Sequence, residues 1–515
     1  MPQGRKLMPR PGSAEELRRF AEVQRRLAPL FEKAFPDRRA RQTVLVVPSL
    51  SLDVEELAKI SGVHHYEERL LCMLMLLRMP GANLIYVTSQ PIASTIIDYY
   101  LHLLPGIPTS HARRRRLTLL SCHDASSAPL TRKILDRPRL MDRIRAAVPD
   151  REAAHMTCFN TTPLERTLAV QLDIPIYAND PALNHLGIKS GNKEVFREAG
   201  IDMPDGAEHL RDAGNIAQAL ADLKRRNPGL RRAAVKLNEG FSGEGNATFS
   251  YGGAPESGDL TRWISSELPR RIRFEAKNET WERYCQKFEE MGGIVESFVE
   301  GEEVRSPSVQ CRIEPLGQAC IVSTHDQVLG GPSGQIFLGA AFPADEEYRQ
   351  DIHEAGHRVC NVLQEKGVLG RFAVDFVSVR RGDGWEHAAI EINIRKGGTT
   401  HPYLMLQFLT DGDYDVSRGL YYTPTGQPCY YYASDNLQSD DYVGLTPDDL
   451  IDIAVNNELH FDAADQQGVV FHLIGALSEF GKLGTVCIGD SRESARKLYH
   501  DTVAILDREA RQNLP

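Results

Sequence analysis

The sequence predicts an α/β protein: a parallel-sheet domain at the N-terminus, a larger domain of mixed helices and strands, and a small C-terminal domain. Over the first 150 residues, short apolar runs alternate with segments of helical periodicity, which is typical of parallel βαβ units. From about residue 184 onwards, isolated apolar runs and a glycine-rich stretch replace this regular alternation. The length of 515 residues is sufficient for three or four domains.

The first predicted domain follows a basic extension, residues 1–40, which contains one amphipathic helix. The helix is expected at about 14–35. Beyond it, apolar runs predict strands and periodic segments predict helices. The strands fall at 44–47, 84–87 and 117–120, and the helices at about 66–78 and 96–104. No G-x-G-x-x-G follows the first strand, so the sequence predicts no dinucleotide site there.

The remaining chain predicts a second set of elements. A helix at about 192–199 ends at Gly200, which is suited to the position after a helix C-terminus. The other expected elements are a helix at 215–226, strands at 233–237, 293–298, 319–323, 373–379 and 388–394, a buried segment at 469–477 and a helix at 491–508.

Composition and charge narrow the class of protein. No run of about 18 apolar residues and no signal-peptide core occurs, and nine scattered cysteines lack a C-x-x-C motif. These features favour a cytoplasmic protein without a membrane partner. The net charge of −10 combines +9 over residues 1–150 with −19 over the rest. Arg113–Arg116 suggests nucleic-acid binding or a solvated loop, and we favour the loop because no aromatic residues accompany the arginines.

The segment Ile390-Glu-Ile-Asn-Ile394 carries the clearest chemical pattern. On a strand, Glu391, Asn393 and Arg395 project from one face, while the three isoleucines can pack into a core on the other. Carboxylate and amide oxygens suit Mg²⁺, with Mn²⁺ as an alternative ion, and Asp375 on a neighbouring strand can add another oxygen ligand. Arg395 would meet phosphate or an acyl-phosphate oxyanion. The alternative is a half-exposed strand with a solvated polar face.

Two further segments suggest nucleotide chemistry. Lys236 ends a strand before a glycine-rich loop that contains Ser242 and Gly243; such loops let backbone N–H groups approach phosphates, although a plain hairpin fits as well. In the second segment, residues 294–303, a strand runs into an acidic turn. Its backbone can pair with an adenine edge and Glu303 with ribose hydroxyls, and the alternative is an acidic surface turn.

Together these segments resemble the ATP-grasp superfamily. Lys189 lies eleven residues before Gly200, as the first nucleotide lysine of that family does, and Lys236 matches the second. Glu296, Gly301 and Glu303 match its adenine-linker pattern, and Asp375, Glu391 and Asn393 its metal strands. The resemblance implies catalytic roles for Arg395 and Lys236, metal ligation by Asp375, Glu391 and Asn393, and ATP contacts by Lys189, Lys236, Ser242, Gly243, Glu296, Phe298, Val299 and Glu303.

A narrower resemblance, to the pheganomycin-type peptide ligases, covers most of the chain. It rests on the N-terminal α/β module and on the segments 189–192, 241–246, 323–327 and 468–484. It implies a pre-ATP-grasp domain (41–180), an ATP-grasp domain (181–410, with its lid at about 190–295) and a C-terminal peptide-ligase-type domain (411–515).

The resemblance implies an ATP-dependent ligase. The enzyme would join a carboxylate, from an amino acid or guanidino acid, to an amine or short peptide through an acyl phosphate, releasing ADP and phosphate. The alternatives are an aminoacyl ligase acting on a carrier protein and a non-catalytic ATP-binding sensor or scaffold. No nucleic-acid partner is expected, and a homodimer is compatible with the sequence.

Substrate contacts are suggested at Arg305, His325, Gln327 and His401, which lie in or beside family-like segments. Ion pairs and loop hydrogen bonds are the alternative roles for these residues. The acidic segment 435–449 could receive a cationic guanidino group, or could simply be a solvated loop.

One motif points to a different class of enzyme. His353-Glu-Ala-Gly-His357 is a literal H-E-x-x-H, in which Glu354 would be the general base of a zinc hydrolase. An apolar stripe at helical spacing turns the histidines toward the polar side of the helix, and Gly356 weakens that helix. No metzincin-type third histidine follows.

Overall fold

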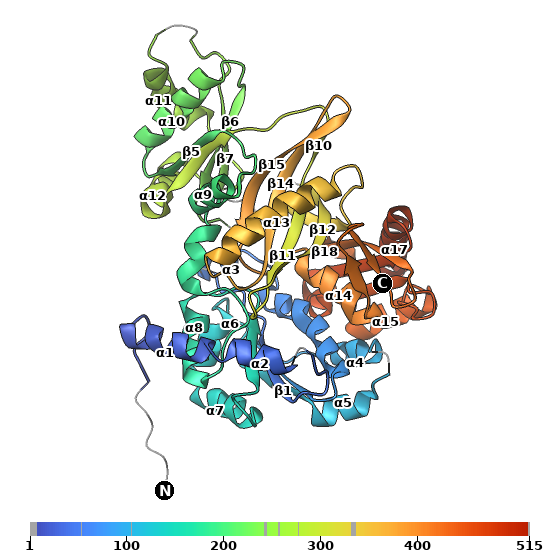
Figure 1. Ribbon diagram of the computed structural model, residues 1–515. Coiled ribbons are helices and arrows are strands. Elements are labelled where there is room, and N and C mark those ends of the chain that lie inside the picture. Colours follow the sequence, from blue (N-terminus) through green and yellow to red (C-terminus); the bar gives the residue numbers. More distant parts are fainter. Residues whose placement is uncertain are drawn as a thin grey trace.

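The computed structural model describes residues 8–34, 36–52, 54–104, 106–240, 245–255, 258–276, 278–330 and 336–512. Figure 1 shows the N-terminal domain at the bottom, a central sheet region beside the C-terminal elements, and a projecting group of green helices and strands at the top. This group, residues 189–297, corresponds to the segment predicted as a lid and is called the lid below. None of the helices in these ranges combines the length and the apolar character needed to cross a membrane.

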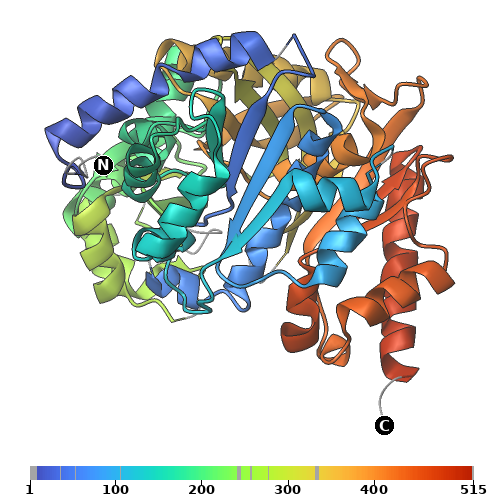
Figure 2. The same cartoon turned by 90° about the horizontal axis from the view of Figure 1, so that it is seen from below.

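The N-terminal domain is built on a four-stranded parallel sheet of order β3-β2-β1-β4. Every residue of β1 is buried, as expected where helices cover both faces of a parallel sheet (Figure 2). The predicted βαβ organisation is therefore confirmed. The strands are β1 (Gln42–Val47), β2 (Ala82–Thr88), β3 (Leu117–Ser121) and β4 (Ala154–Cys158), and the helices α3 (Val54–Ala58), η1 (Val63–Arg78), α4 (Ser94–His102), α5 (Thr109–Arg115), α6 (Leu130–Leu135), α7 (Pro138–Ala147) and α8 (Pro163–Leu172).

The single helix predicted near the N-terminus is two helices, α1 (Ala14–Gln24) and α2 (Leu27–Ala34). Pro29 accounts for the break, because its ring would clash with the carbonyl group of residue 25 in a continuous helix. These helices pack on the first domain: the buried Glu16 accepts a hydrogen bond from Thr167 (2.7 Å) and pairs with Arg166 (3.5 Å). The helix predicted at about 66–78 is η1, a 3₁₀-helix over Val63–Arg78.

The lid is a five-stranded antiparallel sheet of order β5-β9-β6-β7-β8, packed against helices. Helix α9 ends at Gly200, whose φ of 62° is the left-handed conformation expected of a C-terminal glycine. The elements are α9 (Lys189–Ala199), β5 (Gly206–Leu210), α10 (Ala213–Arg226), β6 (Arg232–Leu237), β7 (Asn246–Ser250), α11 (Leu260–Arg271), β8 (Arg273–Phe274), α12 (Trp281–Met291) and β9 (Gly293–Ser297); η2 (Pro181–Gly187) precedes them.

An eleven-stranded sheet forms the centre of the molecule. Helix α13 (Arg349–Glu365) covers it and buries the predicted apolar stripe, including Ile352 and Val359. A Cβ on Gly356 would lie 2.6 Å from Val309, so the glycine permits close approach of helix and sheet. The strands of this region are β10 (Val304–Arg305), β11 (Pro307–Ile313), β12 (Ala319–Gly330), β13 (Ile336–Phe342), β14 (Gly370–Arg381) and β15 (Gly384–Asn393), followed by α14 (Thr400–Thr410).

The C-terminal elements extend the same sheet. Strand β18 (Pro428–Gln438) pairs with β13 on one side and with β20 (Lys482–Gly489) on the other. The segment predicted as buried, 469–477, is indeed buried, and Leu473 (φ 55°) divides it into a strand and a turn. The other elements are β16 (Asp413–Asp415), β17 (Leu420–Tyr422), η3 (Asp440–Tyr442), α15 (Pro447–Asn456), β19 (Gly468–His472), η4 (Ile474–Ala476), α16 (Leu477–Phe480) and α17 (Arg492–Gln512).

Candidate active site

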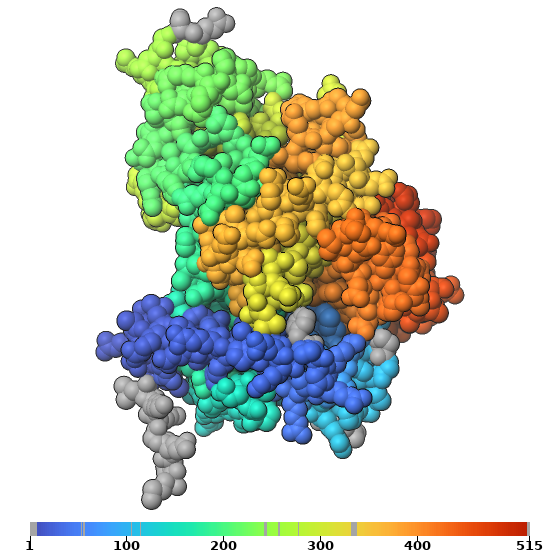
Figure 3. Space-filling model, in the orientation of Figure 1, coloured from blue at the N-terminus to red at the C-terminus, as the bar shows by residue number. Residues whose placement is uncertain are grey.

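A cleft of about 1040 Å³ lies between the lid sheet and the central sheet. In Figure 3 the lid projects beyond the rest of the molecule, beside the β14–β15 hairpin. Strands β6 and β9 line the cleft from the lid, and β14 and β15 from the central sheet. Residues of the N-terminal domain and of β18 also reach it, so every major part of the molecule contributes to its wall.

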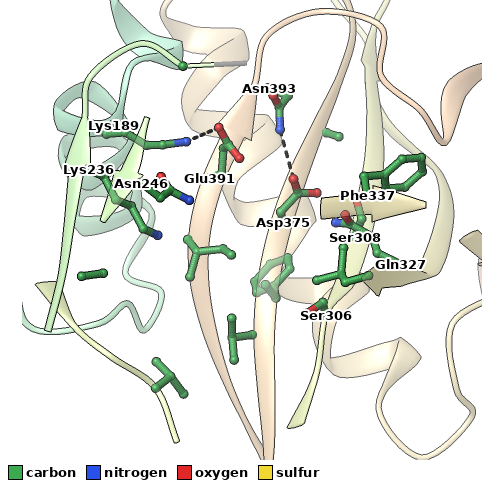
Figure 4. Close-up of a pocket in the computed structure, with 18 of the residues that line it drawn as sticks. Lys189, Lys236, Asn246, Ser306, Ser308, Gln327, Phe337, Asp375, Glu391 and Asn393 are labelled. Carbon is green, nitrogen blue, oxygen red and sulfur yellow. Dashed lines mark hydrogen bonds and ion pairs between the residues drawn. The ribbon is translucent and has the colours of Figure 1, made fainter. Parts of the chain in front are cut away.

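The central sheet brings the predicted metal ligands together. Asp375 on β14 lies opposite Glu391 on β15, and Asn393 Nδ2 donates a hydrogen bond to Asp375 Oδ2 at 3.0 Å (Figure 4). Ile390, predicted to pack into the core, lines the cleft instead. The reason is a β-bulge: Ile390 is the extra residue between the Asp375–Glu391 and Phe376–Ala389 pairs, which shifts the alternation of side chains.

The two carboxylates of this cluster have opposite pKa shifts. Burial raises the pKa of Asp375 to about 6, with Glu391 adding to the rise. Burial would also raise the pKa of Glu391, but the ammonium group of Lys189, which pairs with it, lowers that pKa instead. Two neighbouring carboxylates and an amide form a hard-oxygen donor set that fits Mg²⁺, whose charge would offset their repulsion.

The second predicted lysine belongs to a buried triad in the lid. Glu296 forms ion pairs with Lys236 and Lys193, each at 2.6 Å. Burial would raise the pKa of Glu296, but the two ammonium groups lower it to about 2. Burial would lower the pKa of Lys236, but Glu296 raises it. Lys236 therefore stays charged at the cleft wall, as a phosphate contact requires. The sequence did not single out Lys193, although it belongs to the Lys189-Ser-Gly-Asn-Lys193 segment.

The predicted adenine linker follows β9, and its residues 296–302 line the cleft. Phe298 and Val299 line the cleft, and the Arg232 guanidinium lies 4.2 Å from the centre of the Phe298 ring. Glu303 is not among the lining residues of the described chain. Its carboxylate pairs with Arg380 (2.9 Å) and Arg305 (2.7 Å), which lower its pKa.

The glycine-rich loop joins β6 to β7. Ser242 and Gly243 lie outside the described residues, but Gly240 and Gly245, on either side of them, line the cleft. Arg395 also lines it. Burial lowers the pKa of Arg395, against the opposing effect of Glu391 and Asp375.

The four predicted substrate residues have different positions. Gln327 lines the cleft beside Phe337 (Figure 4). Arg305 is exposed and pairs with Glu303, and His325 is buried with its Nε2 2.6 Å from the Tyr431 hydroxyl. His401 is buried 4.6 Å from the His472 ring. These three residues do not line the cleft as far as the structure describes it.

Other parts of the chain complete the cleft. Tyr66 and Arg69 come from η1, Phe159 follows β4, and Asp435 and Asn436 come from β18. The sequence indicated Asp435 only as part of the acidic segment 435–449. Tyr66, Arg69 and Phe159 had no local motif, because they belong to elements far from the ATP-grasp segments in the sequence.

The H-E-x-x-H motif lies on α13, away from the cleft lining. His357 is exposed, and its Nδ1 lies 3.3 Å from Asn361 Nδ2. Within the described ranges, no group of three or more His, Cys, Asp or Glu side chains is arranged to hold a metal ion. The zinc-hydrolase interpretation therefore has no third ligand there to support it.

Comparisons with known proteins identify the relatives of this chain. Residues 260–417 match the family described as IQCH-like, ATP-grasp, and residues 449–502 match the PGM1 C-terminal domain. The chain is 32% identical over 446 residues to L-propargylglycine–L-glutamate ligase of Streptantibioticus cattleyicolor, covering 85% of this chain and 89% of that protein. It is 24% identical over 401 residues to IQ motif-containing protein H of Danio rerio, covering 70% of this chain but only 38% of that protein.

Solved structures support the same fold. The ADP complex of an N5-carboxyaminoimidazole ribonucleotide synthetase matches with a TM-score of 0.51 and 13% identity over 91% of this chain and 97% of that chain. The biotin carboxylase domain of Hydrogenobacter thermophilus 2-oxoglutarate carboxylase matches with a TM-score of 0.50 and 12% identity over 88% of each chain. The sequence relative, the matched families and the fold lead to one conclusion: the chain belongs to the ATP-grasp ligase family that includes L-propargylglycine–L-glutamate ligase.

Proposed function

We propose that this protein is an ATP-dependent carboxylate–amine ligase that joins an amino acid or guanidino acid to an amine or short peptide. The proposal rests on one observation: cationic side chains line one side of the cleft, and a cluster of oxygen donors lines the other side. Lys189 and Lys236 come from the lid, while Asp375, Glu391 and Asn393 come from the central sheet. The ligase relative, which covers most of the chain, supports the same activity.

The chemistry explains why these groups are needed. A carboxylate is a poor electrophile, so transfer of the γ-phosphoryl group of ATP first converts it to an acyl phosphate. The amine nitrogen then attacks the acyl carbon, the bond from that carbon to the phosphate oxygen breaks, and phosphate and one proton are released. Phosphoryl transfer depends mainly on positioning and on charge stabilisation. We assign these tasks to Lys189, Lys236 and Arg395, and the adenine-facing wall to Glu296, Phe298 and Val299.

The metal cluster contributes a further part of this stabilisation. When bound, Mg²⁺ would neutralise charge on the β- and γ-phosphate oxygens. Asp375, Glu391 and Asn393 would hold it. Among the described residues that line the cleft, they are the ones that bring carboxylate and amide oxygens together on two paired strands. Lys189, paired with Glu391 in this structure, is then available to a phosphate. A water-excluding lid tip is predicted at 240–246, because acyl phosphates hydrolyse readily in water; residues 241–244 of that segment lie outside the described chain.

The direct test is an ADP-release screen of carboxylate and amine pairs, with mass spectrometry of the products. Amino acids, guanidino acids and short peptides form the panel. We expect ADP release that requires both a carboxylate and an amine, together with a product whose mass is the sum of the two minus water. An ATP-binding sensor would bind nucleotide without such release. Failure across the whole panel would contradict the proposed function.

A further inference from the structure

Arg69 and Asp435 are two charged residues of the cleft wall that have no role in the proposed phosphate chemistry. Arg69 on η1 and Asp435 on β18 both line the cleft, and their nearest side-chain atoms are 3.7 Å apart. Only 8% of the Arg69 side chain and 12% of the Asp435 side chain are exposed. Burying two charges costs free energy unless they gain partners, so their position in a cleft wall requires an explanation.

The guanidinium of Arg69 lies against two aromatic side chains of the cleft wall. It lies 4.5 Å from the centre of the Tyr66 ring and 4.3 Å from that of Phe159, while Nε donates a hydrogen bond to the Tyr66 carbonyl oxygen at 3.3 Å. Such stacking orders the planar fork of an arginine before a ligand arrives. Burial lowers the pKa of Arg69, Asp435 raises it, and repulsion from Arg395 lowers it further. Arg69 is therefore within electrostatic range of the proposed reaction centre.

The terminal atoms of this pair retain hydrogen-bonding capacity. A separation of 3.7 Å exceeds hydrogen-bond length. Among the described residues, the one hydrogen bond of the Arg69 side chain is made by Nε, and the Asp435 carboxylate has ionic interactions with Arg69 and Lys482. Lys482 itself donates a hydrogen bond to the Tyr66 hydroxyl at 2.6 Å. The guanidinium N–H groups and the carboxylate oxygens are thus placed to bind a ligand.

We infer that Arg69 and Asp435 hold the amine-bearing substrate, and that this substrate is an α-amino acid with a free carboxylate. The inference rests on the proposed ligase function. An α-amino acid arrives as a zwitterion, and its two charges match this pair: the guanidinium fork binds the carboxylate and Asp435 the ammonium group. The N-terminus of a carrier protein or long peptide has an ammonium group but no adjacent carboxylate, so it would leave the Arg69 fork unmatched.

The test compares three nucleophiles with the carboxylate that the ADP-release screen identifies. They are the preferred L-amino acid, its α-carboxamide, and hydroxylamine, which is small and lacks a carboxylate. For the unmodified protein we expect kcat/KM to be about 10- to 100-fold higher for the amino acid than for its carboxamide, because the carboxamide loses a charge-assisted contact. This comparison needs no variant and does not depend on how any variant folds.

Variants then assign the effect to the two residues. Arg69→Gln should raise KM for the amino acid about 10- to 100-fold and abolish the preference over the carboxamide. The KM for hydroxylamine should rise far less, and Arg69→Lys should restore part of the amino-acid affinity. Asp435→Asn should raise KM for all α-ammonium nucleophiles alike. Arg225→Gln, which removes an exposed partner of Asp222 on the lid, is the matched control and should leave every KM unchanged.

Three outcomes would overturn the inference. The first is equal use of the amino acid and its carboxamide by the unmodified protein. The second is an Arg69→Gln variant that loses affinity for hydroxylamine as much as for the amino acid. The third is an Asp435→Asn variant in which only the KM of a guanidino donor rises, which would place the donor there. In all three cases ADP release still occurs, whereas failure of the proposed function would leave no release to measure.

Discussion

Charged side chains in and beside the cleft pair with one another. Lys189 pairs with Glu391, Lys236 shares Glu296 with Lys193, and Asp375 accepts a hydrogen bond from Asn393. For Lys236, the partner Glu296 raises the pKa against the effect of burial, which would otherwise favour the neutral amine. In the proposed reaction, phosphate oxygens and a metal ion replace some of these partners.

Glu391 provides the first test at this scale. Glu391→Ala should lower kcat for ADP release by more than about 100-fold, because the variant loses a proposed metal ligand and leaves Lys189 unpaired. Circular dichroism and the unfolding midpoint should show that the variant is folded. Glu386→Ala, on the same strand but with a side chain that is 71% exposed, is the matched control. Normal ADP release by the Glu391 variant would contradict the metal assignment.

Asp375 provides a test that combines activity with stability. Its pKa of about 6, against an ordinary 3.8, means that ionisation of this carboxyl destabilises the folded state. Below pH 3.8 the group is protonated in both states and has no effect. Between pH 3.8 and about 6 the unfolded chain loses this proton while the folded protein keeps it, so the free energy of unfolding falls by on the order of 3 kcal/mol over that range and stays lower above it. Asp375→Asn should therefore raise the free energy of unfolding at pH 8 in metal-free buffer, while losing activity.

The measurement is urea unfolding in the presence of EDTA at pH 8 and pH 5. The difference between Asp375→Asn and the unmodified protein should be largest at pH 8 and should shrink at the lower pH. Asp383→Asn, in the exposed turn between β14 and β15, is the control and should show no such trend. The explanation would be refuted if Asp375→Asn raised the free energy of unfolding less at pH 8 than at pH 5.

At the scale of elements, two local features position the site. The bulge at Ile390 changes which side of β15 faces the cleft, so that Ala389 is buried while Ile390 and Glu391 both line the cleft. Helix α13 packs directly against β11, the neighbour of β14, which carries the proposed metal ligand Asp375. We therefore expect the position of β14 and β15 to depend on how closely this helix packs.

Gly356 is the residue through which that packing can be tested. Alanine would strengthen an isolated helix by about 1 kcal/mol. Here, however, its Cβ would lie 2.6 Å from Val309 Cγ1 and 3.0 Å from Val309 Cβ, on a fully buried β-branched side chain that cannot easily move. Gly356→Ala should therefore destabilise the protein by roughly 1–3 kcal/mol in urea unfolding.

His357→Ala is the matched control for this helix, because His357 is exposed one residue further on. It should change the free energy of unfolding by less than about 0.5 kcal/mol. The same variant should retain ADP release, since the proposed reaction makes no use of the H-E-x-x-H motif. A more stable Gly356→Ala variant would show that helix and sheet can separate at no cost.

At the scale of the whole molecule, the site depends on contacts between domains. Lys396, next to Arg395, is buried and donates hydrogen bonds to the Thr157 hydroxyl (3.1 Å) and the Cys158 carbonyl oxygen (2.5 Å) at the end of β4. Arg78 on η1 similarly donates to the Gln407 carbonyl oxygen at 3.1 Å. These contacts hold the N-terminal domain against the central sheet, where Tyr66, Arg69 and Phe159 complete the cleft.

Lys396 tests this arrangement. Lys396→Ala should lower the free energy of unfolding by about 1–3 kcal/mol, because the buried Cys158 carbonyl loses its charged donor. Limited proteolysis should show faster cleavage between the N-terminal domain and the rest of the chain. Lys497→Ala, which removes an exposed lysine paired with Asp501, should behave like the unmodified protein. Equal stability of the two variants would show that the contact does not hold the domains together.

The sequence alone was enough to predict the parallel arrangement of the N-terminal sheet, the strands β12, β14 and β15 of the central region and the ATP-grasp family. Apolar periodicity, lysine spacing and the Glu391-x-Asn393 pattern are local signals that can be recognised in a single sequence. Local signals also placed Gly200 correctly at the end of α9. Apolar periodicity did not predict the break before Pro29, which divides one amphipathic pattern into two helices. It also did not predict the orientation of Ile390, because a bulge depends on the register of the neighbouring strand.

Only the tertiary structure decided which distant residues share the cleft. It joined Arg69 and Phe159 to Asp435, and it placed Lys193 beside Glu296. It also placed His325 and His401 in the interior and paired Glu303 with arginines. The physical reason is that such contacts depend on how domains pack and on how strands pair across long separations in sequence. The spacing of residues along one chain carries no information about either. The sequence therefore predicted the ATP-grasp motifs, whereas the other residues that line the cleft were found only in the tertiary structure.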